Sequence, residues 1–175
     1  GRQLREAGRA RVIDFVRNGG GYIGICAGAY LAMQGGDTSQ KLLLVAARNR
    51  TGGAWRRGVA GVWVEAEGRP RFRLFYANGP IFTPDTTGGA PYVELARYAG
   101  EVFSRARGTG PGEMLGTPAI VAAASGQGRV LLFSPNPILG GQGVAHPELM
   151  RAGLRWTAAG GAVPDGLEFG DVFPG

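Results

Sequence analysis

The chain has 175 residues, 44% of them hydrophobic and 18% charged, and this length and composition predict one globular domain over residues 1–175. The net charge of +6 comes almost entirely from arginines that are spread along the sequence. A nucleic-acid partner, which would favour a basic stripe with interleaved aromatic residues, and a membrane partner, which would need an apolar run of roughly 18 residues, are therefore not expected.

The first predicted elements are an amphipathic helix and a buried strand. Apolar residues such as Leu4 and Phe15 recur near helical spacing over Gln3–Arg17, and Asn18-Gly19 predicts a left-handed stop. The strand Tyr22–Ile25 follows at once. A helix that runs into a buried strand is the second half of a strand–helix–strand crossover, so we expect one or more N-terminal strands to be missing from this chain.

The next feature is a nucleophile elbow, Gly24-Ile25-Cys26-Ala27-Gly28, between that strand and a helix predicted over 27–33. Gly24 and Gly28 are expected because larger side chains would collide where strand and helix approach closely. The helix N-terminus is expected to lower the pKa of Cys26, and the Ala27 N–H to stabilise an oxyanion. The alternative is a small buried cysteine in a glycine-rich turn. As the only cysteine, it excludes an internal disulfide and fits a reducing, cytoplasmic location.

The rest of the chain alternates between strands and turns until a final helix. The pattern predicts strands at Leu42–Ala47, Val59–Glu65, Arg71–Tyr76 and Tyr92–Tyr98, a loop at 101–116, a hairpin of Ala119–Ala124 with Arg129–Ser134, and a helix at Pro147–Ala159. The glycine- and proline-rich residues 160–175 are predicted to form a surface tail. A crossover followed by hairpins indicates a three-layer α/β sandwich with an antiparallel portion.

One string carries a resemblance to a known group. Residues 19–30, Gly-Gly-Gly-Tyr-Ile-Gly-Ile-Cys-Ala-Gly-Ala-Tyr, closely resemble the elbow of the class I glutamine amidotransferase-like superfamily, nearest to the biotin-protein ligase N-terminal domain family. Weaker strings follow in the expected order at 76–82, 118–121 and 128–135, so the resemblance spans about residues 3–160. It implies a flavodoxin-like three-layer α/β/α fold, with one or two more strands before the first helix.

The resemblance also implies a chemistry, which this sequence supplies only in part. In the superfamily's amidotransferases the cysteine attacks the glutamine side-chain amide, a histidine and a glutamate complete the triad, and the thioester is hydrolysed with release of ammonia. At the end of the last long strand, Asn136 stands in the place of that histidine and Ile138 in the place of that glutamate. Asparagine cannot act as a general base, so a triad at this place is absent.

The only histidine, His146, allows two interpretations. In the first it precedes the final helix, which Pro147 opens and whose dipole Glu148 complements. In the second the glycine-rich loop 139–145 folds back and brings His146 to Cys26 as its base. The first interpretation explains every residue without chemistry.

The pocket at the elbow is expected to include Tyr30, Asn78, Gly79 and Asn136. For Asn78-Gly79-Pro80 a plain turn is an equally good interpretation. No metal site is predicted, because one histidine, one cysteine and scattered carboxylates give no ligand spacing, and no cofactor is predicted.

Two functional hypotheses follow. The first is an amidase or acyl-transfer enzyme that acts on a small-molecule amide or carbonyl substrate through a Cys26 thioester, with His146 as the possible base. The alternative is a catalytically degenerate amidotransferase-like binding or regulatory domain that lacks the histidine and glutamate of the triad. A partner synthetase or ligase domain fits either hypothesis, and the sequence predicts no oligomeric state.

Overall fold

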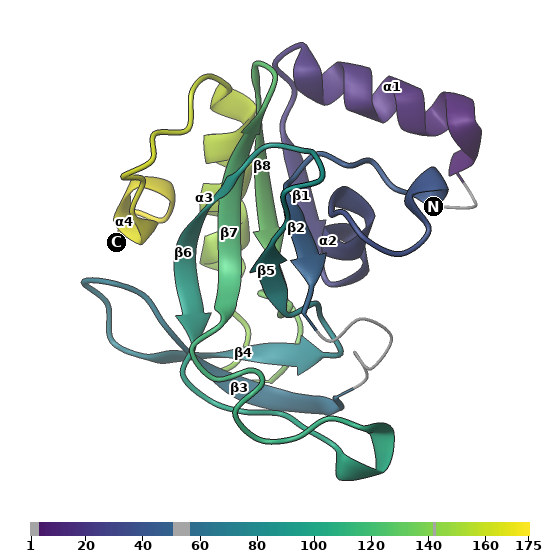
Figure 1. Cartoon of the computed structure of the whole chain (residues 1–175). Coiled ribbons are helices and arrows are strands. Elements are labelled where there is room, and N and C mark those ends of the chain that lie inside the picture. Colours follow the sequence, from purple (N-terminus) through teal and green to yellow (C-terminus); the bar gives the residue numbers. More distant parts are fainter. Residues whose placement is uncertain (1–3, 51–56, 142) are drawn as a thin grey trace.

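The computed structural model describes residues 4–50, 57–141 and 143–175, which form an α/β fold around one mixed sheet (Figure 1). The sheet has six strands in the order β1-β8-β7-β6-β3-β4. Its strands are β1 (Tyr22–Ile25), β3 (Val59–Glu65), β4 (Phe72–Ala77), β6 (Tyr92–Tyr98), β7 (Pro118–Ser125) and β8 (Gly128–Phe133), and β2 (Ala47–Asn49) pairs separately with β5 (Phe82–Pro84). The helices are α1 (Arg5–Arg17), α2 (Ala27–Ala32), α3 (Pro147–Ala159) and α4 (Phe169–Val172), with short 3-10 turns at Thr38–Gln40 and Arg105–Arg107.

The sheet separates two hydrophobic cores. Along β7, Ile120 and Ala122 face a core shared with α3 and α4, whereas Val121 and Ala123 face a core shared with α1 and α2. This alternation is the two-residue period of a strand that is covered on both faces. The helices therefore form a layer on each side of the sheet, which confirms the predicted three-layer α/β/α class.

The two edges of the sheet differ in strand direction. β1 pairs in parallel with β8, and the other neighbouring strands pair antiparallel. In Figure 1, β3 and β4 run across the lower end of the other strands, so that the sheet curls. The curl brings β4 toward the carboxyl end of β1, where Cys26 lies.

Most predicted boundaries agree with the structure. Strands at 22–25, 59–65 and 92–98 and the helix at 147–159 match β1, β3, β6 and α3, and the hairpin matches β7 and β8. The first helix ends at Arg17, and Gly19 has the positive φ (+106°) predicted for the stop. Gln3 lies outside the described residues.

The predicted strand Leu42–Ala47 is wrong. Leu42 and Leu44 are buried, but their N–H groups bond to the carbonyls of Leu31 and Ala32 at the end of α2. Leu43 has a φ of +53°, which no strand residue adopts. The apolar run is therefore a buried loop that follows the helix.

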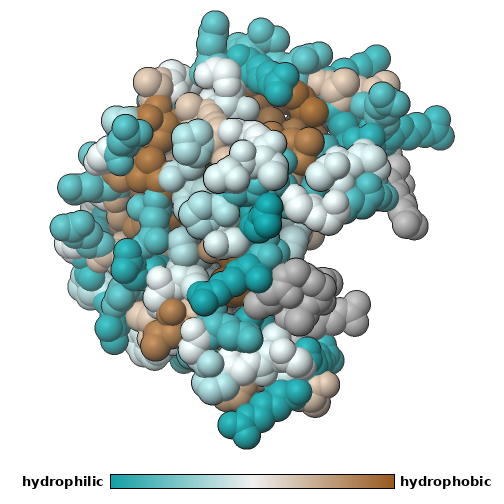
Figure 2. Space-filling view, in the orientation of Figure 1, coloured by the Kyte–Doolittle hydropathy of each residue, from teal (hydrophilic) through white to brown (hydrophobic). Residues whose placement is uncertain are grey.

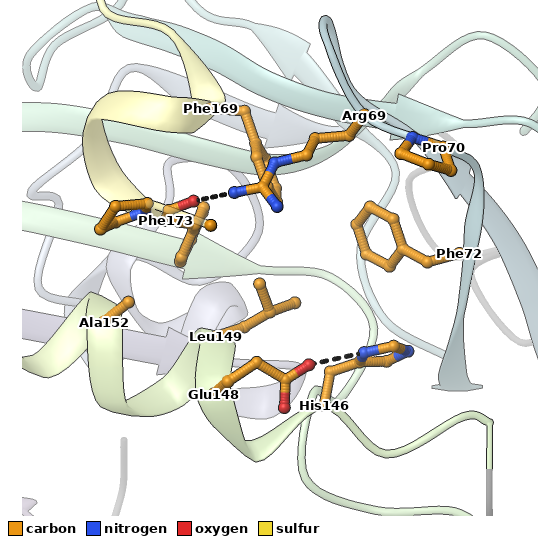
Figure 3. Close-up of a pocket in the computed structure, with 11 residues that line it drawn as sticks. Arg69, Pro70, Phe72, His146, Glu148, Leu149, Ala152, Phe169 and Phe173 are labelled. Atoms are coloured by element: carbon orange, nitrogen blue, oxygen red, sulfur yellow. Dashed lines mark hydrogen bonds and ion pairs between the residues drawn. The ribbon is translucent and has the colours of Figure 1, made fainter.

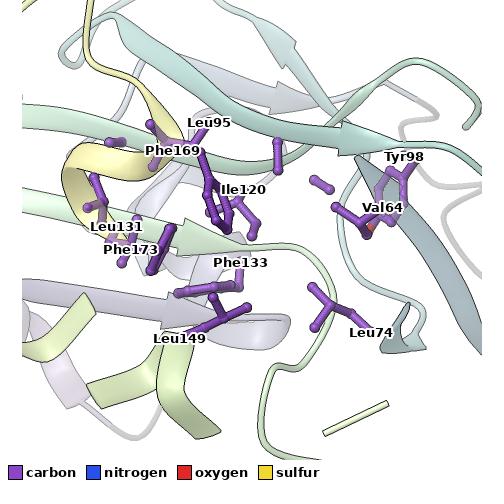
Figure 4. Close-up of a cluster of buried hydrophobic side chains, with 14 of the residues drawn as sticks. Val64, Leu74, Leu95, Tyr98, Ile120, Leu131, Phe133, Leu149, Phe169 and Phe173 are labelled. Atoms are coloured by element: carbon purple, nitrogen blue, oxygen red, sulfur yellow. The ribbon is translucent and has the colours of Figure 1, made fainter. Parts of the chain in front are cut away.

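The two ends of the chain also differ from the prediction. Leu4 and Phe15, expected on the apolar face of the first helix, are 37% and 61% exposed. The predicted surface tail instead contains α4, and Phe169 of this helix and Phe173 just after it pack with Phe133 and its neighbours in the core (Figure 4). On the face shown in Figure 2, hydrophobic side chains form small separate patches among polar ones. No helix in the described part of the chain has the length and apolar character to cross a bilayer.

Candidate functional site at the Cys26 elbow

Cys26 occupies a strained turn between β1 and α2. Its backbone has φ +50° and ψ −103°, an unusual conformation for a residue with a side chain. The turn is held on both sides, because the Cys26 N–H donates to the Phe133 carbonyl and its own carbonyl accepts from the Tyr30 N–H. This is the strand, sharp turn and helix that the elbow string predicts.

The two flanking glycines differ in why they are needed. A Cβ at Gly24 would lie 2.7 Å from the Gly28 carbonyl oxygen and 2.8 Å from a Leu132 methyl, so Gly24 is required by close approach. A Cβ at Gly28 would meet only the Tyr22 hydroxyl, at 3.8 Å. The predicted collision of a larger side chain is therefore confirmed at Gly24 and wrong at Gly28. The Gly28 carbonyl accepts a 2.8 Å hydrogen bond from the Tyr22 hydroxyl.

A pocket of about 430 Å³ opens at the elbow and brings together several predicted residues. Its walls are Cys26, Ala27, Tyr30, Ala77 and Asn78. The Cys26 thiol donates to the Ala77 carbonyl at 3.4 Å, and the Tyr30 hydroxyl donates to the Asn78 carbonyl at 3.4 Å. The end of β4 thus forms the wall opposite the elbow.

Asn78 and Gly79 form the turn that shapes this wall. Asn78 has a φ of +56°, its N–H donates to the Gly58 carbonyl, and its side-chain oxygen accepts from the Gly58 N–H at 2.7 Å. A Cβ at Gly79 would lie 2.0 Å from the Ser134 carbonyl oxygen. Asn78 therefore lines the pocket through its position in a tight turn, and Gly79 lies behind it against the end of β8.

Burial raises the pKa of the Cys26 thiol above its ordinary value, although the Ala27 N–H that bonds to the sulfur acts in the opposite direction. The expected lowering by the helix N-terminus is therefore wrong. α2 has only six residues, and the thiol donates its proton to a carbonyl, which stabilises the neutral form. At neutral pH the sulfur is a thiol.

Asn136 lies at the end of β8 but does not line the pocket. Its N–H donates to the Phe75 carbonyl at 2.7 Å, and its side-chain oxygen accepts from the N–H groups of Ile138 and Leu139. The side chain therefore caps a turn. Ile138 is 48% exposed, and neither Asn136 nor Ile138 has a side chain that can act as an acid or a base.

The structure does not bring His146 to Cys26. His146 caps the start of α3, and its Nδ1 lies 2.8 Å from a Glu148 carboxylate oxygen. Its ring packs edge-on against Phe72 at 5.5 Å, at the opposite end of β4 from Ala77. Five residues of strand separate the two ends by about 16 Å. The helix-start interpretation therefore fits the structure.

One charged residue near the site, Arg57, was not predicted from the sequence. The Arg57 side chain is fully buried and bonds to Glu113 at 2.6 Å, while its Nε and Nη1 have no hydrogen-bond partner in the described structure. Burial raises the pKa values of the Tyr30 and Tyr76 phenols, and the Arg57 charge partly offsets this rise. Nothing in the sequence distinguishes Arg57 from the surface arginines, because its burial depends on long-range contacts.

The described residues contain no group of three or more histidine, cysteine, aspartate or glutamate side chains that could hold a metal ion. The residues that line the Cys26 pocket supply one thiol, one backbone N–H, the Tyr30 hydroxyl and carbonyl groups. This set suits hydrogen bonding to a neutral polar ligand.

Comparison with known proteins supports the resemblance at the elbow. The family described as biotin-protein ligase, N terminal, matches residues 1–40, and no curated protein matches the chain. A crystal structure of a glutamine amidotransferase is 25% identical with a TM-score of 0.49, over 77% of this chain and 62% of that one. A beta-galactosidase from Bacillus circulans sp. alkalophilus is 14% identical with a TM-score of 0.49, over 75% of this chain and 18% of that one. The chain spans less than two thirds of the length of either solved protein. The predicted resemblance to the biotin-protein ligase N-terminal family is confirmed for residues 1–40, which include the elbow.

Proposed function

We propose that this chain is a glutamine amidotransferase-like domain that binds a small amide or carbonyl compound at the Cys26 pocket without cleaving it. One observation carries the proposal: the Cys26 thiol donates its proton to the Ala77 carbonyl, and its pKa is raised. A nucleophilic cysteine needs the reverse, a thiolate or a base that takes the proton.

The residues that would supply a base are committed elsewhere. A Cys–His pair needs contact at roughly 2.6–3.2 Å. His146 instead pairs with Glu148, and the Asn136 side-chain oxygen accepts two backbone N–H groups. Amide cleavage through a Cys26 thioester would therefore require a base from outside the described residues.

The pocket retains the groups that would hold a carbonyl compound. The Ala27 N–H bonds to the Cys26 sulfur and would exchange this bond for one to a ligand carbonyl, and the Tyr30 hydroxyl, which donates to the Asn78 carbonyl, lies on the wall. A volume of about 430 Å³ suits a small molecule. Arg57 is paired with Glu113 and is not among the residues that line the pocket, whose own groups are uncharged, so a neutral amide or carbonyl fits better than an anion. The match of residues 1–40 to a biotin-protein ligase family supports a ligase-type domain as the partner that uses the bound compound.

Ammonia release from L-glutamine, compared between the wild type and Cys26→Ser, tests the absence of cleavage. We expect no turnover above the Cys26→Ser background. Turnover that Cys26→Ser abolishes would show that the chain is an amidase and that a base reaches the thiol.

Chemical-shift titration with L-glutamine and acetamide tests the binding. We expect saturable shifts of the Ala27 and Asn78 amides in the wild type, and their loss in Ala27→Leu, which narrows the pocket. His146→Gln is the matched control and should bind as the wild type does. A folded wild type that shows no saturable shift with either probe would overturn the proposal.

A further inference from the structure

A second pocket of about 360 Å³ lies on the other side of the sheet from the elbow helix, between β4, α3 and α4 (Figure 3). It shares no lining residue with the Cys26 pocket. Its lining includes the rings of Phe72, Phe169 and Phe173, Leu149 and Ala152 of α3, and the polar residues Arg69, His146 and Glu148. An apolar cavity of this size with a few convergent polar groups is typical of a small-molecule site.

The apolar wall is fixed by the core behind it. Phe169 and Phe173 are 4% and 2% exposed, and their ring centroids are 4.6 Å apart. Phe72 packs against Phe169 at 5.8 Å. The wall is therefore preformed, and an apolar ligand would not have to order it on binding.

Arg69 supplies positive charge at one end of the pocket. Its guanidinium lies 5.6 Å from the centre of the Phe169 ring, and its Nη2 donates to the Phe173 carbonyl. These two contacts hold the side chain over the cavity, as Figure 3 shows. The guanidinium has five N–H donors, of which Nη2 serves the Phe173 carbonyl, and Gly175 lies against the same group, so a ligand acceptor would bind beside Gly175.

Glu148 supplies negative charge at the other end. Partial burial raises the pKa of this carboxyl group, but the backbone N–H, the His146 ring and Arg151 outweigh burial and hold it below its ordinary value. Glu148 is therefore a carboxylate at neutral pH and would repel a second anionic group. The His146 Nε2 at this end is buried and has no partner in the described structure.

We propose that this pocket binds a monocarboxylate with an apolar body the size of a phenyl ring, with its carboxylate on Arg69 and its body between Phe72, Leu149 and Phe169. Arginine recognises carboxylates through charge-assisted hydrogen bonds, and the preformed aromatic wall matches a flat apolar body. Glu148 discriminates against dicarboxylates. The proposal does not depend on the function assigned to the Cys26 pocket.

Calorimetric titration of the full chain with 3-phenylpropanoate, 3-phenylpropanamide and phenylsuccinate tests this assignment. We expect saturable binding of the acid, and binding about tenfold weaker for the neutral amide and for the dicarboxylate. Arg69→Gln should remove the preference for the acid over the amide. Ala152→Phe, which fills the cavity, should abolish binding of all three compounds.

Arg71→Gln is the matched control, because it removes the same charge from the same hairpin at a residue outside the pocket. It should leave the affinities unchanged. Equal affinity of the folded wild type for acid and amide, or no saturable binding at millimolar acid, would overturn the proposal. If Ala152→Phe does not fold, loss of the acid preference in Arg69→Gln but not in Arg71→Gln still decides the outcome.

Discussion

The Cys26 pocket and the pocket lined by Arg69 and His146 lie at opposite ends of β4, the first against Ala77 and the second against Phe72. From the sequence, His146 could either open the final helix or act as the base for Cys26. In the structure each has its own partners, the Ala77 carbonyl for the thiol and the Glu148 carboxylate for the imidazole. An elbow motif therefore determines the backbone around a cysteine but not the presence of a base.

The two pockets also differ in the contacts that form their walls. The Cys26 pocket depends on close backbone approach, at Gly24 against α2 and at Gly79 against the end of β8. The other pocket depends on packed aromatic side chains from β4 and α4. A larger side chain at the first pocket, or a smaller one at the second, should therefore lower the free energy of unfolding.

The largest effect is expected from truncating the aromatic wall. Phe169→Ala should lower the free energy of unfolding by about 3–5 kcal/mol, because it removes a ring that is 4% exposed and packs against Phe72 and Phe173. Phe15→Ala is the matched control, and since Phe15 is 61% exposed it should cost less than about 1 kcal/mol. Urea denaturation measures both, and equal losses would mean that α4 does not pack into the core.

Adding one methyl group at the elbow should have the next largest effect. Gly24→Ala places a Cβ 2.7 Å from the Gly28 carbonyl oxygen and should cost about 1–3 kcal/mol. Gly28→Ala has room for the Cβ and a better helix propensity, so it should be neutral or stabilise the protein by up to about 1 kcal/mol. Thermal unfolding of both variants measures the difference, and a Gly24→Ala protein as stable as the wild type would contradict the geometry of the turn.

The sequence could predict the parts of this fold that local pattern controls. Alternating residues predict β3 and, within one residue, β4, and Pro147 after a glycine-rich loop predicts the start of α3. The turn at Cys26 was predictable because a strand, a cysteine between glycines and a helix occur within a dozen residues. The crossover followed by hairpins predicts the three-layer arrangement, and the family resemblance agrees with it.

The rest depended on contacts between distant residues. The run at 42–47 has strand composition, but N–H groups of Leu42 and Leu44 bond to the end of α2. The helix α4 lies in a segment whose glycine and proline content predicts a surface tail. Burial raises the pKa of Cys26, and its thiol donates to the carbonyl of Ala77, which lies 51 residues further along the chain. Arg57 carries no local signal of its burial.

A raised thiol pKa should be measurable by alkylation. The rate of reaction of Cys26 with iodoacetamide should rise with pH through an inflection above the roughly 8.5 of an ordinary thiol, and urea-unfolded protein should show the ordinary value. The contribution of this group to stability is present below the unfolded pKa and is lost as the pH rises through the folded one. Cys26→Ser, which has no thiol, is the blank. A folded-state inflection below that of the unfolded chain would indicate an activated nucleophile and would favour the amidase hypothesis.

The smallest effect is expected at the charged end of the second pocket. The folded pKa of Glu148 is held low, so its contribution to stability is present above the ordinary value of about 4.3 and is lost as the pH falls through the folded value. Because the Glu148 side chain is 61% exposed, Glu148→Gln should cost less than about 0.5 kcal/mol at neutral pH and nothing in strong acid. Glu67→Gln, at an exposed turn residue, should cost nothing at either pH. Urea midpoints at both pH values measure the two variants. If Glu148→Gln lowers the free energy of unfolding equally at both pH values, the carboxylate does not pair with His146. The second pocket would then lack the negative charge that distinguishes it from the Cys26 pocket.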